Sequence, residues 1–302
     1  MMKKFVALIV LSEVAIIAYL LYKIFSMNIP ITGGFYVPPS NVEKISVAYF
    51  EINGCDLTRT EAEDKNLCFK LIPNKHVLCQ RGNKTIDIRI NSLGFRDLEF
   101  SEDKDPNILR IFAMGDSYTY GWGVNLEDTW PKKLERILNS KNLGKKFEVW
   151  NLGIPGLDIW NVANYLVKYS NYSPDIVITS FQGNDVVPEK EVCNSTGCDE
   201  EKIVRIVSNR THRITYINKS FALIRSHFKG MVMIALWPTG YDGDVKMLAK
   251  EYNFSICDLN EIYRKHSFKE LSLEDGHPNE LAYELVAEKI SKCLLRYWGV
   301  RR

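Results

Sequence analysis

The sequence has no block of like charges. Its 302 residues include 39 basic and 37 acidic side chains, for a formal net charge of +2, and both signs are spread along the chain. Proteins that bind nucleic acids gather positive charge on one face or along one helix. We therefore expect no nucleic-acid partner.

Metal-binding spacings are also missing. The spacings of the seven cysteines and five histidines match no zinc pattern, and no spacing indicates a cofactor. We therefore expect neither a metal ion nor a cofactor. The cysteines are instead consistent with an oxidising compartment. Cys55, Cys68 and Cys79 lie before the main domain, and two of them are candidates for a disulfide.

The other four cysteines differ in context. Cys193 and Cys198 flank a short polar loop and are candidates for a small disulfide. Cys257 ends an apolar run, and Cys293 lies on the apolar face of a helical pattern. A cysteine in such a setting behaves as a small hydrophobic residue. We therefore expect Cys257 and Cys293 to be buried thiols.

The N-terminus carries a long apolar run. Lys3 and Lys4 precede an apolar stretch of roughly 18 residues that ends near Tyr22, close to the shortest helix that spans a bilayer. Lys23 follows, without a small-residue cleavage motif, which favours an uncleaved anchor over a cleaved signal peptide. The leading lysines place the N-terminus in the cytoplasm. We expect residues 1–27 to form a single transmembrane signal anchor, with the rest of the chain extracytoplasmic.

The rest of the chain divides at about residue 105. Residues 28–105 contain alternating runs such as 85–90, whose period of two predicts half-exposed strands. We interpret this segment as a linker followed by a small β-rich extension. In residues 106–302, short apolar runs alternate with helical patterns, and a polar insertion interrupts them at about 186–226.

This alternation predicts a parallel sheet covered by helices on both faces. The predicted strands are 108–114, 147–152, 175–181, 231–236 and 254–257. The predicted helices include 130–138, 159–169, 245–252 and 280–297. The expected fold class is α/β: a flavodoxin-like, three-layer α/β/α domain with a five-stranded parallel sheet, preceded by the transmembrane helix and the β-rich extension.

Ser117, in the run Gly115-Asp116-Ser117, follows the first predicted strand at its carboxyl end. Open α/β sheets bind ligands at this edge. A helix that begins at Ser117 would point backbone N–H groups at an anion, and a serine nucleophile there would need a base. The three residues are also typical of a simple turn, so alone they leave both interpretations open.

Three later runs lie where they could reach the same edge of the sheet as Ser117. Residues 151–156 (NLGIPG) follow the second strand, residues 181–185 (FQGND) follow the third, and residues 275–279 (DGHPN) precede the last helix. Each run alone fits a glycine-rich turn or a helix cap. All four runs in this order indicate a site.

The four runs resemble the sequence blocks of the SGNH (GDSL) hydrolase superfamily. The resemblance covers about residues 108–295. Residues 91–97 (NSLGFRD) also resemble a segment that commonly precedes the first block in bacterial members. A membrane-anchored member of this superfamily would be a hydrolase of carboxylic esters.

The resemblance also implies roles for particular residues. Ser117 would be the nucleophile and His277 the general base. The backbone N–H groups of Ser117 and Gly156 and the side-chain amide of Asn184 would form the oxyanion hole, with Gly153 as the alternative to Gly156. Each such donor contributes on the order of 3 kcal/mol to transition-state binding.

The carboxylate of the triad is open at this point. Many superfamily members place an aspartate three residues before the histidine, where this chain has Glu274, and Asp275 lies two before it. A shorter carboxylate at a tight turn can orient His277 through its second ring nitrogen, which favours Asp275. Asp116 and Asp185 are expected to be structural hydrogen-bonding groups.

The expected function is that of a serine esterase that forms an acyl-enzyme and removes, or transfers, O-acetyl groups on extracellular glycans. An anchored, outward-facing domain suits an acetylated polysaccharide that is too large to enter the cell. Two alternatives stay open: a lipase or thioesterase for membrane-borne acyl esters, and a non-catalytic glycan-binding or assembly protein. Trp122 either lines a sugar subsite or packs in the core.

Overall fold

Short apolar runs form the central sheet, because alternate residues of each run are buried on opposite faces. The five strands in chain order are β5 (Ile108–Gly115), β6 (Lys146–Gly153), β7 (Ile176–Phe181), β10 (Met231–Leu236) and β11 (Ser255–Asp258). Their bounds differ by at most one residue from those predicted. The spatial order is β11-β10-β7-β5-β6, with all neighbours parallel, which is the doubly wound order of a flavodoxin-like fold.

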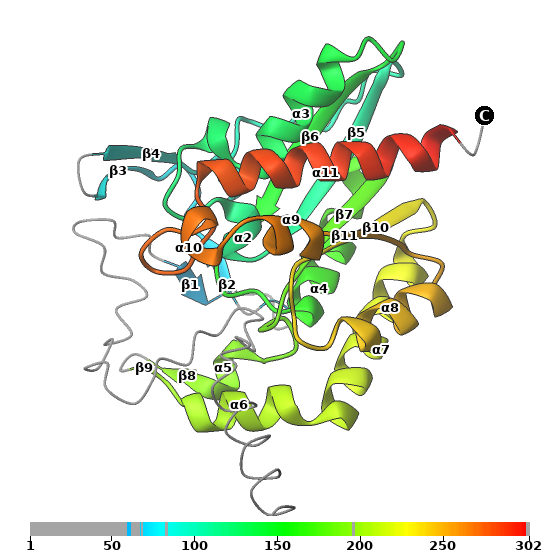
Figure 1. Cartoon of the computed structure of the whole chain (residues 1–302). Coiled ribbons are helices and arrows are strands. Elements are labelled where there is room, and N and C mark those ends of the chain that lie inside the picture. The colour runs from blue at the N-terminus through cyan, green and yellow to red at the C-terminus, as the bar shows by residue number, and fades with distance from the viewer. Residues whose placement is uncertain (1–58, 62–66, 68, 82–83, 195–196, 300–302) are drawn as a thin grey trace, which may run out of the picture. The chain divides into compact units, whose positions relative to one another are not determined.

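The computed structural model describes residues 59–61, 67, 69–81, 84–194 and 197–299, which belong to one compact unit (Figure 1). The anchor predicted at residues 1–27 lies outside these residues. Within the described ranges, no helix is long and apolar enough to cross a bilayer. The anchor therefore stays a prediction.

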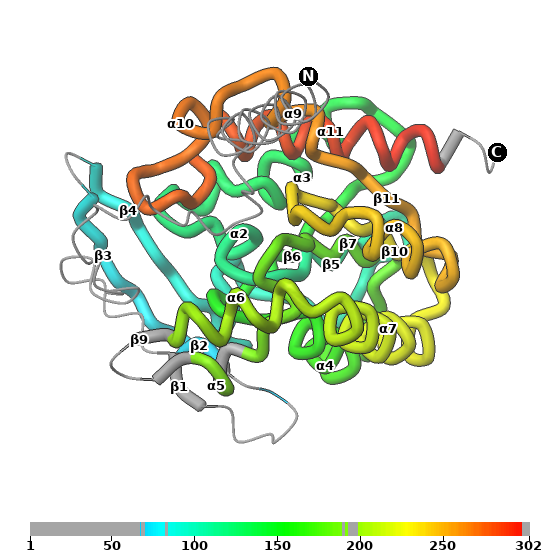
Figure 2. The backbone as a smooth tube through the Cα atoms, turned by 60° about the horizontal axis from the view of Figure 1, so that its bottom comes forward, coloured from blue at the N-terminus to red at the C-terminus, as the bar shows by residue number. Residues whose placement is uncertain are grey.

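Helices cover both faces of the sheet (Figure 2). On one face α3 (Trp130–Ser140) packs against α11 (Glu280–Gly299), and on the other α4 (Ile159–Tyr169) and α8 (Asp242–Glu251) pack against α7 (Arg210–His227). Shorter helices are α2 (Ser117–Tyr120), α5 (Glu189–Val192), α6 (Glu200–Ser208), α9 (Asn260–Lys265), α10 (Phe268–Leu271) and the 3-10 turns η1 (Leu126–Asp128) and η2 (Ser170–Tyr172). The predicted three layers are present.

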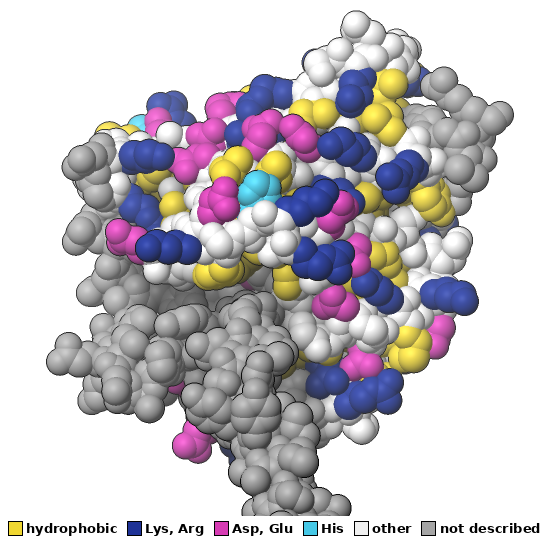
Figure 3. Space-filling model, in the orientation of Figure 1, with side chains coloured by type: hydrophobic (Ala, Val, Ile, Leu, Met, Phe, Trp, Pro, Cys, Tyr) yellow, Lys and Arg dark blue, Asp and Glu magenta, His cyan; other side chains and the backbone are white. Residues whose placement is uncertain are grey.

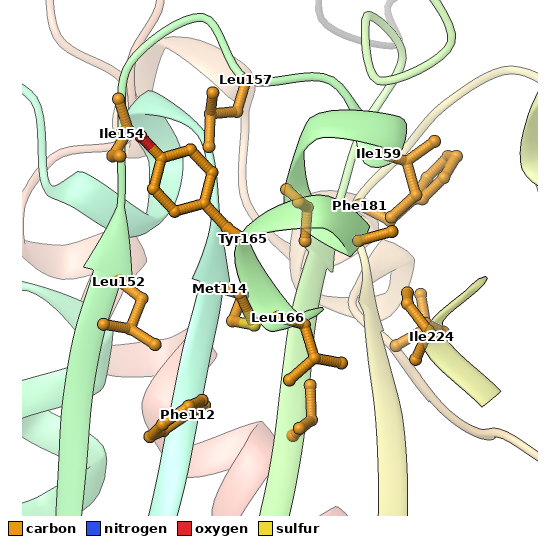
Figure 4. Packing of buried hydrophobic residues seen from close by; sticks show 14 of the residues in the cluster. Phe112, Met114, Leu152, Ile154, Leu157, Ile159, Tyr165, Leu166, Phe181 and Ile224 are labelled. Atoms are coloured by element: carbon orange, nitrogen blue, oxygen red, sulfur yellow. The ribbon is translucent and has the colours of Figure 1, made fainter. Parts of the chain in front are cut away.

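Two hydrophobic cores fill the space between the layers. On β5, Phe112 and Met114 belong to the core beneath α4 and α7, whereas Ile111 and Ala113 belong to the core beneath α3 and α11. Figure 4 shows side chains of the first core meeting from the sheet and from the helices. Because both faces of β5 are sealed, its carboxyl end is a rigid platform for the turn that follows.

The extension before the sheet forms two antiparallel hairpins. β1 (Arg59–Glu61) pairs with β2 (Phe69–Leu71), and β3 (His76–Arg81) pairs with β4 (Lys84–Arg89). Within β4, Ile86 and Ile88 are buried while the residues between and around them are more exposed. This alternation is the one that the period of two in the sequence predicts.

Arg96 fastens the extension to the segment after the first central strand. Its side chain is fully buried and donates hydrogen bonds to the carbonyl groups of Gly121 (2.6 Å), Val124 (2.7 Å) and Asp87 (3.3 Å). These bonds satisfy the two terminal nitrogens of a buried guanidinium and so reduce the cost of burying it. Arg96 therefore ties β4 to the turn that follows α2.

Side chains of both charges are interspersed over the face that α11 crosses (Figure 3). Several of them are paired: Lys84 lies 2.5 Å from Glu280 at the start of α11, and Lys133 lies 2.7 Å from Glu284. The exposed Lys84–Glu280 pair contributes less than about 1 kcal/mol, whereas the side chain of Lys133 is only 10% exposed. Their effect here is to join neighbouring elements in a defined register.

The predicted insertion at about 186–226 contains α5, α6, most of α7 and a short hairpin. The hairpin consists of β8 (Cys193–Asn194) and β9 (Gly197–Cys198), and its backbone register places Cys193 opposite Cys198. The side chains of these two cysteines lie outside what the structure describes. Their disulfide therefore stays a prediction.

Cys257 and Cys293 are not the buried thiols that the sequence led us to expect. Cys257 on β11 and Cys293 on α11 form a disulfide, with their Cα atoms 5.8 Å apart. The apolar face of α11 packs against β11, which brings the two side chains to the usual separation of a disulfide. Cys79 is also disulfide-bonded.

Removing the Cys257–Cys293 bond should lower the free energy of unfolding by about 3–4 kcal/mol, because 36 residues separate the cysteines and the bond restricts the unfolded chain. Denaturant unfolding of the double variant Cys257→Ala/Cys293→Ala beside wild type measures the loss. In a reducing buffer the difference should largely vanish. Alkylation of both cysteines in unfolded, unreduced wild type would contradict the bond.

Candidate active site

A tight turn at the end of β5 presents Ser117. Asp116 caps α2, since its buried carboxylate accepts a hydrogen bond from the backbone N–H of Tyr118 (2.9 Å). Ser117 is the first residue of α2, a position whose backbone N–H the helix itself leaves unused. β5 lies between β6 and β7, where the strand order reverses and where such sheets bind ligands.

The loop before α11 brings His277 to Ser117. His277 Nε2 lies 3.0 Å from Ser117 Oγ, and the histidine is only 6% exposed. A hydrogen bond from Leu273 N to His277 O (2.7 Å) closes the loop. The side chain of Asn279 then accepts from the N–H of Ala282 (3.0 Å) in the first turn of α11. Residues 275–279 therefore cap helix α11 and also supply His277.

Asp275 is the carboxylate that the structure places against His277. Its Oδ1 lies 3.3 Å from His277 Nδ1 and accepts from the His277 backbone N–H at 3.2 Å. Its Oδ2 accepts from the indole N–H of Trp122 (3.1 Å) and lies 3.0 Å from Arg81 Nη2. Glu274 is exposed. Of the two carboxylates that the sequence left open, the geometry favours Asp275.

The same contacts keep Asp275 ionised. Burial raises the pKa of Asp275, but the hydrogen bonds and positive charges of His277 and Arg81 outweigh burial and hold the pKa well below its usual value. A carboxylate held in this state can orient a neutral imidazole and stabilise the imidazolium formed when the histidine takes a proton.

The predicted oxyanion donors lie in the turns after β5, β6 and β7. The turn that contains Gly156 is joined to the end of β5, because the N–H of Ile154 donates to the carbonyl of Gly115 (3.1 Å). Asn184 follows β7, and its side chain hydrogen-bonds to the carboxylate of Asp116, next to the candidate nucleophile. The parallel sheet therefore gathers the three turns at one edge.

Gly153, the alternative donor, has a packing role. It ends β6, and a Cβ at this position would lie 2.2 Å from the backbone nitrogen of Tyr120 in α2. Only glycine allows such a close approach. The N–H of Gly153 already donates to the side chain of Asn151 (3.0 Å). Gly156 is therefore the better candidate for the oxyanion hole.

Asp116 and Asp185 are buried acids that brace these turns. Burial raises the pKa of Asp116 to about 6, and burial together with the charge of Asp116 raises the pKa of Asp185 well above its usual value. Gln182 connects them: its side-chain amide donates to Asp116, and its backbone N–H donates to Asp185 Oδ2 at 2.5 Å. These contacts are those of structural hydrogen-bonding groups.

Ser117, His277 and Asp275 thus lie in the order in which a hydroxyl can pass its proton to an imidazole while a carboxylate stabilises the resulting charge. This order is the requirement for nucleophilic attack on an acyl group. The adjoining turns carry the residues that the sequence predicts as donors for the negative charge on the carbonyl oxygen.

Comparison with known protein families agrees with this chemistry of acyl groups. A model that describes GDSL-like lipases and acylhydrolases matches residues 111–290, which is more than half of the chain. The chain belongs to the GDSL-like lipase/acylhydrolase family. As a member it is an enzyme that hydrolyses carboxylic esters, and the resemblance to SGNH hydrolases seen in the four sequence runs is confirmed.

Several solved structures are similar to this GDSL-family chain. A lipolytic G-D-S-L protein from Veillonella parvula DSM 2008 is 18% identical, with 61% of this chain and 97% of that chain covered and a TM-score of 0.42. A family 3 carbohydrate esterase from Clostridium thermocellum is 18% identical, with 61% and 94% covered and a TM-score of 0.46. No curated protein sequence matches the chain.

Two contacts in the site of this GDSL-family enzyme were missed from the sequence. Trp122 is buried, at 6% exposed, and its indole N–H is engaged by Asp275, so it belongs to the core rather than to a sugar subsite. Arg81 lies in the extension, outside the family match, and no motif marks it. Only the fold brings Arg81 to the loop that carries Asp275.

Asp275→Asn should lower kcat by about 10³- to 10⁴-fold, because an amide neither fixes the tautomer of the imidazole nor stabilises its charged form. Steady-state kinetics with p-nitrophenyl acetate measures the loss. Glu274→Gln is the matched control: it removes the same charge one residue away, and its kcat should stay within about twofold of wild type. A larger loss in Glu274→Gln than in Asp275→Asn would reverse the choice of carboxylate.

Proposed function

We propose that this esterase removes O-acetyl groups from glycans outside the cell, through an acyl-enzyme on Ser117. The observation that carries the proposal is the 3.0 Å contact between Ser117 Oγ and His277 Nε2, with Asp275 on the other side of the imidazole. A serine hydroxyl hydrogen-bonded to a neutral imidazole can lose its proton as it attacks a carbonyl carbon.

The first half of the reaction transfers the acetyl group to the enzyme. Ser117 Oγ attacks the acetyl carbonyl carbon, and the hydroxyl proton passes to His277 Nε2. The carbonyl oxygen becomes an oxyanion, which the N–H groups of Ser117 and Gly156 and the side-chain amide of Asn184 would stabilise. The bond to the sugar oxygen then breaks, and His277 donates the proton to that oxygen.

The second half releases acetate. His277 takes a proton from a water molecule whose oxygen attacks the acetyl carbon, and the bond to Ser117 Oγ breaks as His277 returns the proton to the serine. If a sugar hydroxyl takes the place of the water, the same residues transfer the acetyl group to a second glycan. The triad serves hydrolysis and transfer equally well.

A cleft of about 440 Å³ lies near the turn of Asn184, where His212 Nε2 is 2.9 Å from the carbonyl of Val186. Its lining exposes more apolar than polar surface, with Pro188 and Tyr216 beside Lys219, and the nucleophile does not line it. The glycan substrate is therefore proposed from the location of the enzyme and not from this cleft.

Two features support a position on the outer side of a membrane. The disulfide between Cys257 and Cys293 is of a kind that persists in oxidising compartments. The apolar run within residues 1–27, preceded by Lys3 and Lys4, fits a single helix with a cytoplasmic N-terminus. The proposed enzyme is therefore a single-pass membrane protein that acts on acetylated polysaccharide at the cell surface.

Ser117→Ala should abolish ester hydrolysis, with a loss of kcat of about 10⁴-fold or more, because no other group replaces the nucleophile. The full-length chain is assayed with p-nitrophenyl acetate, octanoate and palmitate, and with an acetylated polysaccharide from which acetate release is measured. The acetate ester and the polysaccharide should be the best substrates. Ser226→Ala, which removes an exposed serine of α7, is the matched control and should keep wild-type rates.

Each result has one interpretation. Equal rates for Ser117→Ala and wild type would remove the catalytic role of Ser117. Faster hydrolysis of palmitate than of acetate would replace the glycan esterase by a lipase or thioesterase.

A further inference from the structure

The Asp275 carboxylate is held from two sides. Oδ1 faces both the ring nitrogen and the backbone N–H of His277, whereas Oδ2 faces Trp122 and Arg81. A carboxylate at a loop position can rotate about its side-chain bonds unless its second oxygen is held as well. The partners of Oδ2 therefore decide how often Oδ1 is aligned with the imidazole.

Arg81 is the charged partner of Oδ2. It is the last residue of β3, and its Nη2 lies 3.0 Å from Asp275 Oδ2. The side chains of Arg81 and Asp275 are 20% and 34% exposed, so water screens this pair less than it screens most surface ion pairs. A planar guanidinium also fixes the direction of its donors, which the round ammonium group of a lysine does not.

The loops of the site leave room for this guanidinium. A Cβ at Gly123, in the turn after α2, would lie 2.0 Å from Arg81 Nη1 and 2.7 Å from a methyl carbon of Leu273. The bare backbone of Gly123 therefore faces both the guanidinium and the loop that carries His277. Any side chain at this position would displace Arg81.

The hairpin that carries Arg81 is itself fixed to the domain. Lys84, the residue opposite Arg81 in the hairpin, lies 2.5 Å from Glu280 at the start of α11. Farther along β4, the N–H of Asp87 donates to the side chain of Asn125 (3.0 Å). The contact of Asp87 fixes the backbone of β4, and the Lys84–Glu280 pair adds a weaker link, so Arg81 reaches Asp275 from a hairpin that is tied to the domain.

We propose that Arg81 is a positioning residue for the ester hydrolysis: it holds Asp275 in the orientation that supports His277, so that the β3–β4 hairpin is an integral part of the active site. This inference rests on the proposed roles of Ser117, His277 and Asp275. It assigns a role to a segment that precedes the family match at residues 111–290.

Arg81 has an electrostatic effect as well. His277 and Arg81 together hold the pKa of Asp275 below its usual value, against the effect of burial. Loss of Arg81 should therefore raise the pKa of Asp275 and loosen the carboxylate that supports His277.

The test compares Arg81→Gln and Arg81→Lys with wild type in the full-length chain. Arg81→Gln should lower kcat by about 10- to 100-fold, as a small misplacement of a catalytic group does, with KM nearly unchanged. Arg81→Lys keeps the charge but not the planar fork of donors, so kcat should recover only in part. Arg89→Gln, an exposed arginine of the same hairpin that contacts Asp87, is the matched control and should behave as wild type.

A double-variant cycle separates positioning from general support of the fold. In the Asp275→Asn background, Arg81→Gln should cause little further loss of kcat, because Arg81 acts through Asp275. Full additivity, a rise in KM with unchanged kcat, or wild-type behaviour of Arg81→Gln would each overturn the inference. If Ser117→Ala keeps activity in the same assay, the proposed function fails; if Ser117→Ala is inactive and Arg81→Gln is wild type, only the role of Arg81 fails.

Discussion

The hydrogen bond between Ser117 Oγ and His277 Nε2 joins two points that lie 160 residues apart in the chain, and the surrounding fold fixes both ends of it. Ser117 stands at the end of β5, between β6 and β7, with a sealed core on each face of the sheet. His277 stands in a loop closed on itself and continuous with α11, which packs against α3. Two packed cores therefore fix the position of Ser117, and the closed loop together with α11 fixes that of His277.

The orientation of the Asp275 carboxylate depends on a wider part of the molecule than the position of Ser117 does. Ser117, Asp275 and His277 all lie within the range that the family model matches. Arg81 comes from the extension, and Arg96 ties that extension to the turn after α2. A segment added before a common fold can thus adjust the orientation and charge of a triad without altering the triad itself.

The sequence predicts the central strands well because a buried parallel strand is a short apolar run between turns, a local property. It favours Asp275 over Glu274 only weakly, since two partners that hold the Asp275 carboxylate, Trp122 and Arg81, are distant in sequence. The same limit applies to Cys257 and Cys293, because disulfide pairing follows from which helix packs on which strand. Arg81 is the extreme case: its role exists only once the hairpin docks.

The most direct test of the account is covalent labelling by a fluorophosphonate, which reacts with activated serine hydroxyls. Peptide mass mapping of the labelled full-length chain should find one label per molecule, on Ser117, with loss of esterase activity in parallel. His277→Ala should slow the labelling by about 10²-fold or more, because the hydroxyl then lacks its base. Label on a different serine with loss of activity, or full activity with Ser117 labelled, would contradict the claim that Ser117 is the nucleophile.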